Sequence, residues 1–264
     1  MPPSRPQPRR FNVDRLRVEV HADGGALGAA VSTAAAAAVA DAIAVRGVAN
    51  VMFATGNSQL EFLDAFMARP DVDWSRIVGF HMDEYIGIGP DHPASFARYI
   101  RERIVERASV PPRAFHLIDG LTDPAAEAAR YTALLAAHPL DLVCMGVGEN
   151  GHLAFNDPPF ARFDDPVDLK VVTLDAASRW QQVGEGHFPD IDAVPETALT
   201  VTVPALLRAG VDLVAAPEAR KAPAILAALT GPITTECPAS ILRETPHARL
   251  FLDTGSASRL PPSV

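Results

Sequence analysis

The stretch that decides the fold runs from Asp141 to Asp157 and reads DLVCMGVGENGHLAFND. Its first five residues are almost continuously apolar, which is typical of a strand buried on both faces of a parallel sheet. The strand runs directly into the turn Gly146-Val147-Gly148, where glycines let backbone amides approach a ligand closely. Ligands of open α/β sheets bind where strands end in such loops. The stretch therefore predicts an α/β protein with a site after this strand.

Short apolar runs and helical patterns alternate along the rest of the chain. Further strands are expected at 48–54, 76–81, 115–118, 171–174, 199–203, 211–215 and 249–252. Helices are expected at 27–45, 58–66, 94–106, 124–137, 219–230 and 238–244. This alternation predicts a mainly parallel sheet covered by helices on both faces. Since no interdomain linker or repeat is visible, residues 11–264 are expected to form a single domain after a disordered leader, 1–10, that is rich in Pro and Arg.

Composition narrows the class of function. A chain of 264 residues that is 48% apolar can bury a substantial core. Its net charge of -9 argues against a nucleic-acid surface, which needs clustered Lys and Arg, although one cationic clamp can still hold a small phosphorylated ligand. The two cysteines, Cys144 and Cys237, predict neither a disulfide framework nor a metal site. No secretory signal is recognisable at the start and the Ala-rich helix reads as a packed one, so a cytoplasmic protein is expected.

A polar turn, Thr55-Gly56-Asn57-Ser58, follows the strand expected at 48–54. Ser58 and Glu61 have the spacing of a capping box, so a helix is expected to begin there. The free N–H groups and the dipole of a helix N-terminus favour a bound phosphate. A turn that only caps the helix explains the residues equally well, and both interpretations stay open.

The stretch His81-Met82-Asp83-Glu84-Tyr85 follows the next strand. Adjacent side chains of an extended chain point in opposite directions, so only one of Asp83 and Glu84 is expected to face a pocket. A carboxylate beside a bound sugar is a suitable base for removing a proton from the carbon next to a carbonyl. Spacing alone favours the alternative, in which the pair caps the following loop.

His152 lies between Asn150 and Asp157, and both can orient an imidazole and decide which nitrogen carries the proton. A lone histidine is more often structural, whereas one between two polar partners at a strand end is more often a proton-transfer group. Lys221 and Lys170 are the only lysines in the chain. Because Lys221 begins a helix just after a strand, it is a candidate anion clamp, with a surface lysine as the alternative.

Taken in order, five segments resemble the glucosamine-6-phosphate deaminase (isomerase) family. They are ATGNS (54–58), FHMDEYIGIGPDHPASF (80–96), DLVCMGVGENGHLAFNDPP (141–159), VPETALTVTVPALLRA (194–209) and the helix that begins at Lys221. The resemblance implies a Rossmann-like three-layer α/β sandwich. It also implies an aldose-to-ketose isomerisation, without metal or cofactor, that releases ammonia from an amino-sugar 6-phosphate and leaves a ketose phosphate.

By motif, the resemblance assigns catalytic roles to Asp83, His152, Asn150 and Asp157. Asp83 would be the base that moves a proton between C2 and C1, and His152 would assist ring opening with support from the other two. Substrate and phosphate binding is expected of Thr55, Gly56, Asn57, Ser58, Glu84, Gly151, Arg179 and Lys221. The expected partner is a small amino-sugar phosphate rather than a nucleic acid or a membrane, and a homo-oligomer stays possible.

The chain also departs from the family pattern. Asn150 stands where many members have Asp, and it supplies no charge to a protonated imidazole. Asp157 stands where those members have Glu. Gly184 aligns with an arginine that holds phosphate in well-known members, which leaves Arg179 or His187 as possible substitutes. These departures indicate a divergent branch of the family, and the sequence leaves open whether its substrate must carry a phosphate.

Three other functions compete with this interpretation. A 6-phosphogluconolactonase shares the glycine turn and histidine, but its motif continues with small hydroxyl residues where this chain has AFND at 154–157. A non-catalytic sugar-phosphate sensor that regulates transcription needs a DNA-binding module, for which residues 1–47 offer little. A metal hydrolase needs close ligand spacing, which His81, His92 and His152 lack.

Overall fold

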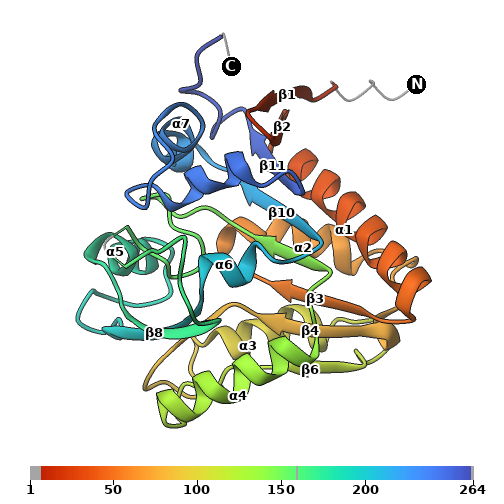
Figure 1. Cartoon of the computed structure of the whole chain (residues 1–264), viewed down its shortest axis with the longest axis vertical. Coiled ribbons are helices and arrows are strands. Elements are labelled where there is room, and N and C mark those ends of the chain that lie inside the picture. Colours follow the sequence, from red (N-terminus) through yellow and green to blue (C-terminus); the bar gives the residue numbers. More distant parts are fainter. Residues whose placement is uncertain (1–6, 159, 263–264) are drawn as a thin grey trace.

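The computed structural model describes residues 7–158 and 160–262, which fold around an eight-stranded sheet of order β1-β2-β11-β10-β7-β3-β4-β6 (Figure 1). Every neighbouring pair is parallel except β1 and β2. Its strands are β1 (Arg9–Val13), β2 (Leu16–His21), β3 (Ala49–Phe53), β4 (Ile77–His81), β6 (Ala114–His116), β7 (Leu142–Met145), β10 (Val211–Ala216) and β11 (Ala248–Asp253). The predicted mainly parallel sheet is confirmed.

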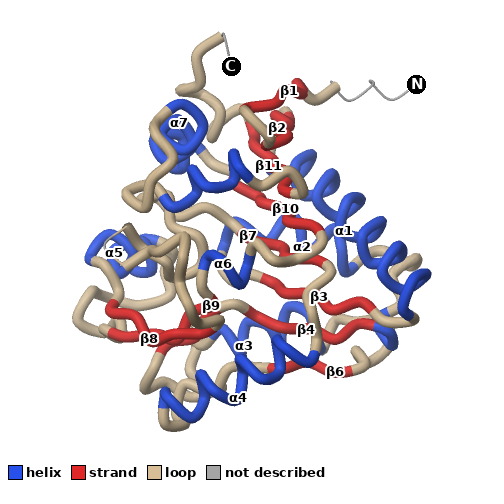
Figure 2. The backbone as a smooth tube through the Cα atoms, in the orientation of Figure 1, coloured by secondary structure: helices blue, strands red, loops and turns tan. Residues whose placement is uncertain are grey.

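Helices cover both faces of this sheet, which makes the predicted three-layer sandwich (Figure 2). The helices are α1 (Gly24–Arg46), α2 (Leu60–Met67), α3 (Phe96–Ile100), α4 (Pro124–Ala137), α5 (Ala176–Gly184), α6 (Val203–Leu206) and α7 (Ala222–Thr230). Leu27 of α1 and Phe66 of α2 belong to the core on one face, whereas Tyr131 of α4 and Ile225 of α7 belong to the core on the other. Each face of the sheet therefore has its own apolar core.

The long helix α1 begins and ends where the sequence has capping residues. The side chain of Asp23 accepts a hydrogen bond from the amide of Ala26 at 2.7 Å, and Gly47 ends the helix with a positive φ of 75°. A Cβ on Gly28 would lie 2.6 Å from the backbone of Glu61, so glycine is needed where α1 and α2 cross. Among the described residues, α1 is the one helix long and apolar enough to cross a membrane, and it packs on the sheet as core helices do.

A second, smaller sheet stands beside the main one and was not distinguished in the sequence. It has three strands in the order β5-β9-β8, and both pairs are antiparallel. These strands are β5 (Asp83–Tyr85), β8 (Leu169–Thr173) and β9 (Thr197–Val201). The strands expected near 171–174 and 199–203 therefore exist, but they belong to this sheet.

Some predicted boundaries are wrong. Residues 1–10 were expected to form a disordered leader, yet Arg9 and Arg10 pair with β2 as part of β1; residues 1–6 lie outside the described residues. The helix expected at 94–106 is α3 followed by a π turn, η3 (Arg101–Val105). Residues 238–244 form a 3-10 helix, η5 (Pro238–Glu244).

The helix after the Thr55 turn also begins differently from the prediction. A 3-10 turn, η1 (Asn57–Gln59), precedes α2, and no side chain caps either element. Gln59 Nε2 donates to Ser58 Oγ at 3.2 Å. The predicted capping box is therefore absent, which leaves the Ser58 hydroxyl at the edge of the turn rather than on a helix amide.

The order in which the strands join the sheet creates a crevice. The chain passes from β3 to β4 and β6 on one side, then returns to β7 on the other side of β3 and continues to β10 and β11. Such a reversal separates the loops at the carboxyl ends of the strands and leaves room for a ligand. The segments after the four adjacent strands β10, β7, β3 and β4 carry Lys221, His152, the Thr55 turn and Asp83, respectively.

Candidate active site

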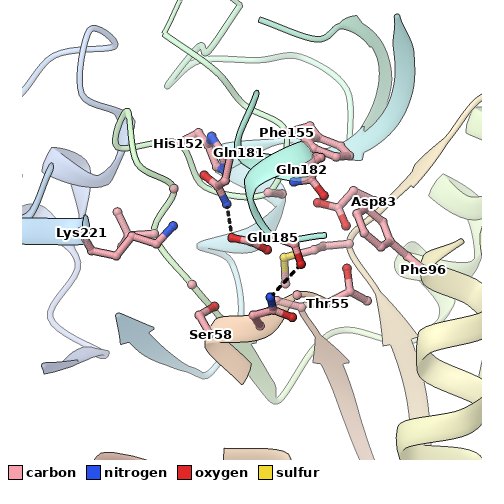
Figure 3. A pocket seen from close by; sticks show the side chains of 18 residues that line it. Thr55, Ser58, Asp83, Phe96, His152, Phe155, Gln181, Gln182, Glu185 and Lys221 are labelled. Carbon is pink, nitrogen blue, oxygen red and sulfur yellow. Dashed lines mark hydrogen bonds between the residues drawn. The ribbon is translucent and has the colours of Figure 1, made fainter. Parts of the chain in front are cut away.

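A cavity opens at the carboxyl ends of these strands, and Figure 3 shows the side chains that line it. Of the predicted site residues, those that line it are Thr55, Gly56, Asn57, Ser58, Asp83, His152 and Lys221. The structure adds lining residues that the sequence did not indicate, among them Phe96, Phe155, Gln181, Gln182 and Glu185. The fold therefore brings together the turn, the carboxylate, the histidine and the lysine that were predicted separately.

Asp83 enters the cavity from the first position of β5, where it lies opposite Thr200 of β9. Its side chain is buried, and its Oδ1 atom has no hydrogen-bond partner in the described chain. Burial raises the pKa of Asp83 well above its usual value, and the negative charge of Glu84 adds to the shift. Asp83 is therefore a carboxyl group with a strengthened affinity for a proton and a free oxygen to receive one.

Glu84 does not line the cavity, contrary to the prediction. Its Oε2 accepts hydrogen bonds from Ser95 Oγ and the Ala97 amide, both at 2.8 Å, and its Oε1 accepts from the Phe96 amide at 3.1 Å. Burial raises the pKa of Glu84, although these hydrogen bonds partly offset the shift. Since β5 is extended, consecutive side chains point to opposite sides, and Glu84 fixes the start of α3 instead of a ligand.

The imidazole of His152 is oriented by a carboxylate. His152 Nδ1 lies 2.9 Å from Asp157 Oδ1, and the Ser178 hydroxyl lies 3.0 Å from the same nitrogen. The three hydrogen bonds that Asp157 Oδ1 accepts from His152, Asn150 and Ser178 outweigh burial and lower the pKa of Asp157 to about 2. An ionised Asp157 holds the proton of the imidazole on Nδ1 and leaves Nε2 as an acceptor.

Asn150 acts on the histidine only indirectly. Its Nδ2 donates to Asp157 Oδ1 at 2.9 Å, and its Oδ1 accepts from the backbone amide of His152 at 3.1 Å. The sequence predicted that both Asn150 and Asp157 orient the imidazole, but only Asp157 contacts it. Asn150 positions Asp157 and the backbone of the turn.

Two glycines of the turn make the position of His152 possible. A Cβ on Gly148 would lie 2.2 Å from His152 Nε2, so only glycine lets the imidazole lie over this part of the chain. Gly151 has a φ of +86°, and a Cβ there would lie 2.8 Å from Cys237 Sγ. Gly151 does not line the cavity, contrary to the prediction, and its role is to shape the turn.

The other end of the cavity carries a cation and a polar turn. Lys221 lies at the end of η4 (Ala219–Lys221), and its ammonium forms no hydrogen bond or ion pair within the described residues. Burial and the neighbouring guanidinium of Arg220 lower the pKa of Lys221 to about 8, although Glu185 pulls in the opposite direction. Gly56, with a φ of +113°, turns the chain so that Thr55 and Ser58 face the same space.

Neither substitute expected for the missing phosphate arginine lies in the cavity. Arg179 Nη2 donates to the carbonyl oxygens of Ile191 at 2.6 Å and Val194 at 3.1 Å, so its guanidinium ties α5 to the following loop. His187 Nε2 lies 3.4 Å from Glu185 Oε2 outside the lining. Gly184 ends α5, and a Cβ built on it would meet no atom within 4 Å.

The helix α5 is the part of the site that the sequence interpretation missed. Its N-terminus has a recognisable signal, because the Asp175 side chain accepts from the Ala177 amide at 3.0 Å. Gln181, Gln182 and Glu185 follow at helical spacing and line the cavity. The sequence indicates this region only through the arginine expected at Gly184 and its possible substitutes, and without that helix start the polar side chains could not be assigned to a helix face.

Glu185 is a carboxylate inside the region expected to bind an anion. Its Oε1 accepts hydrogen bonds from Gln181 Nε2 and from Arg220 Nη1, both at 2.9 Å. Burial alone would raise its pKa, but His187, Arg220 and Lys221 lower the pKa of Glu185 to about 2. The group is therefore ionised at neutral pH. Within the residues that the structure describes, no three His, Cys, Asp or Glu side chains gather as ligands for a metal.

The chain matches the sequence model of glucosamine-6-phosphate isomerases/6-phosphogluconolactonase over residues 22–251. It is 33% identical over 217 residues to a glucosamine-6-phosphate deaminase of Lactobacillus delbrueckii subsp. bulgaricus, which covers 81% of this chain and 88% of that protein. A glucosamine-6-phosphate deaminase of Streptococcus pyogenes is 32% identical over 218 residues, or 81% of this chain and 89% of that protein.

Solved structures give a similar result. A monomeric glucosamine-6-phosphate deaminase superposes with a TM-score of 0.83 at 26% identity, covering 91% of this chain and 98% of that one. A 6-phosphogluconolactonase from Shewanella baltica superposes with a TM-score of 0.75 at 18% identity, covering 92% of this chain and 100% of that one. The second likeness concerns the fold alone.

Proposed function

Because this chain belongs to the family of glucosamine-6-phosphate isomerases and 6-phosphogluconolactonases, we propose that it is a glucosamine-6-phosphate deaminase. It is an enzyme that takes a sugar phosphate as substrate. The reaction consumes an amino-sugar 6-phosphate and water and yields a ketose 6-phosphate and ammonia. One observation carries the proposal: the Asp83 carboxyl and the His152 imidazole line one cavity that also holds the ammonium of Lys221, which has no partner in the described part of the chain.

The two proton-transfer groups suit two different steps. His152, with Nδ1 held by Asp157, offers Nε2 to take the proton of the anomeric hydroxyl and deliver it to the ring oxygen, which opens the ring. Asp83 then removes the proton from C2 of the open aldehyde and returns it to C1. The C2 imine that results adds water and expels ammonia, so the oxygen of the ketose comes from water. The raised pKa of Asp83 suits this role, because a stronger base removes a carbon-bound proton more readily.

The opposite end of the cavity suits the phosphate. The turn Thr55-Gly56-Asn57-Ser58 offers hydroxyls and backbone amides, and Lys221 offers a positive charge that needs a partner. Asn150 and Asp157 act as positioning residues for His152. We place the enzyme in the cytoplasm, where a phosphorylated sugar is retained.

The test is an assay of the purified protein in buffer without added metal. Ammonia and fructose 6-phosphate are measured from glucosamine 6-phosphate, and hydrolysis of 6-phosphogluconolactone is measured in parallel. Ammonia and ketose are expected in equal amounts, and Asp83→Asn is expected to abolish both. Turnover of the lactone alone would replace the proposed activity with a lactonase. Tight binding of glucosamine 6-phosphate without any turnover would instead indicate a sensor.

A further inference from the structure

A carboxylate already occupies the end of the cavity where the phosphate of a substrate is expected. Figure 3 shows the Glu185 side chain inside the cavity, with Lys221 on one side and Asp83 on the other. Glu185 Oε2 lies 3.8 Å from the position that a Cβ on Gly56 would take, so it reaches the middle of the polar turn. Only 5% of its side chain is exposed. An anionic ligand and this carboxylate compete for the same space and the same cations.

The local charges make this placement unusual. Arg220 contacts three carboxylates: its Nη1 lies 2.9 Å from both Glu149 Oε1 and Glu185 Oε1, and its Nε lies 2.7 Å from Glu218 Oε2. Glu185 also follows the last residue of α5, where the helix dipole disfavours a negative charge. Arg220 therefore offsets a placement that the helix dipole opposes. Its guanidinium lies just behind the lining of the cavity and contacts the cavity only through Glu185.

We propose that Glu185 is a resident anion of the phosphate subsite, which the phosphate of the substrate displaces, so that Arg220 exchanges the carboxylate for the phosphate and Lys221 gains its anionic partner. The identity of the substrate rests on the function proposed above, whereas the exchange of anions rests on the geometry of Glu185. Arg220 then supplies the second cation of the subsite, which the chain lacks at Gly184. Only a substrate with an anion strong enough to displace Glu185 gains both cations, so Glu185 determines specificity for a dianionic group.

The backbone around Glu185 permits such a displacement. Gly184 and Gly186 flank it, and a Cβ on either glycine would meet no atom within 4 Å. Close packing therefore does not require glycine at these positions, although the φ of +81° at Gly186 favours it. Asp175 caps the start of α5, and the carbonyl oxygen of Glu185 accepts a hydrogen bond from Asn57 Nδ2 at 3.3 Å, so the displacement is a rotation of the Glu185 side chain about a backbone that stays in place.

The experiment is a calorimetric titration of the folded protein with inorganic phosphate. Glu185→Gln keeps the size of the side chain and removes its charge, and it is expected to tighten phosphate binding by roughly tenfold or more. The KM for glucosamine 6-phosphate is expected to fall in parallel. Arg220→Gln is expected to weaken phosphate binding, and the double variant is expected to lose the gain of Glu185→Gln.

Glu218→Gln is the matched control, because it removes one carboxylate from the same guanidinium at a position outside the cavity. Its effect on phosphate binding is expected to stay within about twofold. Unchanged or weaker phosphate binding in Glu185→Gln would overturn the proposal. So would tighter binding of unphosphorylated glucosamine by the native protein than by Glu185→Gln, since Glu185 would then be a ligand for the sugar rather than a competitor of its phosphate. The titration needs no turnover, so a failure of the proposed reaction is seen separately in the ammonia assay.

Discussion

Two carboxylates line two different walls of the cavity, Asp83 at the start of β5 and Glu185 directly after α5. Both are buried, but their neighbours differ. Burial raises the pKa of Asp83, and the neighbouring carboxylate of Glu84 adds to the shift. Burial opposes ionisation of Glu185 as well, but His187, Arg220 and Lys221 lower its pKa to about 2.

The difference shows that neighbouring charge, and not burial, decides the role of an acidic side chain here. Burial is the largest influence on both groups and acts in the same direction on both. Glu84 adds a like charge to Asp83, whereas Arg220 gives Glu185 an opposite one. One wall of the cavity thus holds a proton acceptor and the other a permanent anion.

The largest expected effect comes from removing the base. Asp83→Asn is expected to lower kcat/KM for glucosamine 6-phosphate by about a thousandfold, because an amide cannot take the C2 proton. Incorporation of solvent deuterium at C1 of the ketose, followed by NMR, reports the transfer directly. Glu185→Gln serves as the comparison and is expected to keep that incorporation. Deuterium exchange that persists in Asp83→Asn would assign the base to another residue.

The next effect concerns the group that orients the histidine. Asp157→Asn is expected to lower kcat by roughly a hundredfold, because an amide no longer fixes the imidazole proton on Nδ1. Asn150→Ala, which removes only a hydrogen bond to Asp157, is expected to have a tenfold smaller effect. Equal losses in both variants would mean that the turn as a whole, rather than the carboxylate, positions His152.

The pH dependence of kcat reports on Asp83 and the like charge beside it. Since Asp83 must be deprotonated to act and its pKa is raised, kcat is expected to fall up to tenfold per pH unit below that pKa. Glu84→Gln removes the like charge and is expected to move this limb to lower pH, provided that circular dichroism shows the variant folded. A limb that does not move in Glu84→Gln would belong to the phosphate of the substrate.

The smallest effect is on stability, where the two carboxylates are expected to act with opposite signs. A raised pKa in the folded state means that ionised Asp83 opposes folding above its unfolded pKa of 3.8, so Asp83→Asn is expected to raise Tm at pH 7. A lowered pKa means that Glu185 stabilises the fold above pH 4.5 and loses this contribution as pH falls to about 2, so Glu185→Gln is expected to lower Tm. Scanning calorimetry should show shifts of about 2–4 °C each. Shifts of the same sign would contradict the assignment of opposite environments.

The sequence predicted the parts of the site that follow parallel strands. The apolar run before Gly146 and the glycine turn after it located His152, because strand and turn chemistry are local properties. Alternation along an extended segment correctly required that only one of Asp83 and Glu84 face the cavity. The resemblance named both as site residues and could not choose, because the choice depends on where α3 begins.

The roles of site residues that depend on packing between distant segments could not be predicted from the sequence. Arg179 is an arginine near the expected position, but its guanidinium is taken up by the carbonyl groups of a loop whose course the sequence does not reveal. Glu185 lines the cavity directly after α5, whose Val183 packs against the apolar cluster of the small antiparallel sheet, and strand patterns did not separate that sheet from the main one. Arg220 is connected to the site only through its ion pair with Glu185, which the sequence does not indicate.

The placement of α5 also allows ligand binding to be followed by intrinsic tryptophan fluorescence. The chain has two tryptophans. Trp74 is fully buried against Phe53 and Phe66, whereas 57% of Trp180, on α5, is exposed. The emission of Trp74 is expected to stay constant when phosphate displaces Glu185, so a change of emission on adding phosphate is assigned to Trp180, five residues before Glu185. The native protein thus carries its own probe and its own internal reference, so the rate at which Glu185 leaves the cavity can be followed by stopped flow without a label.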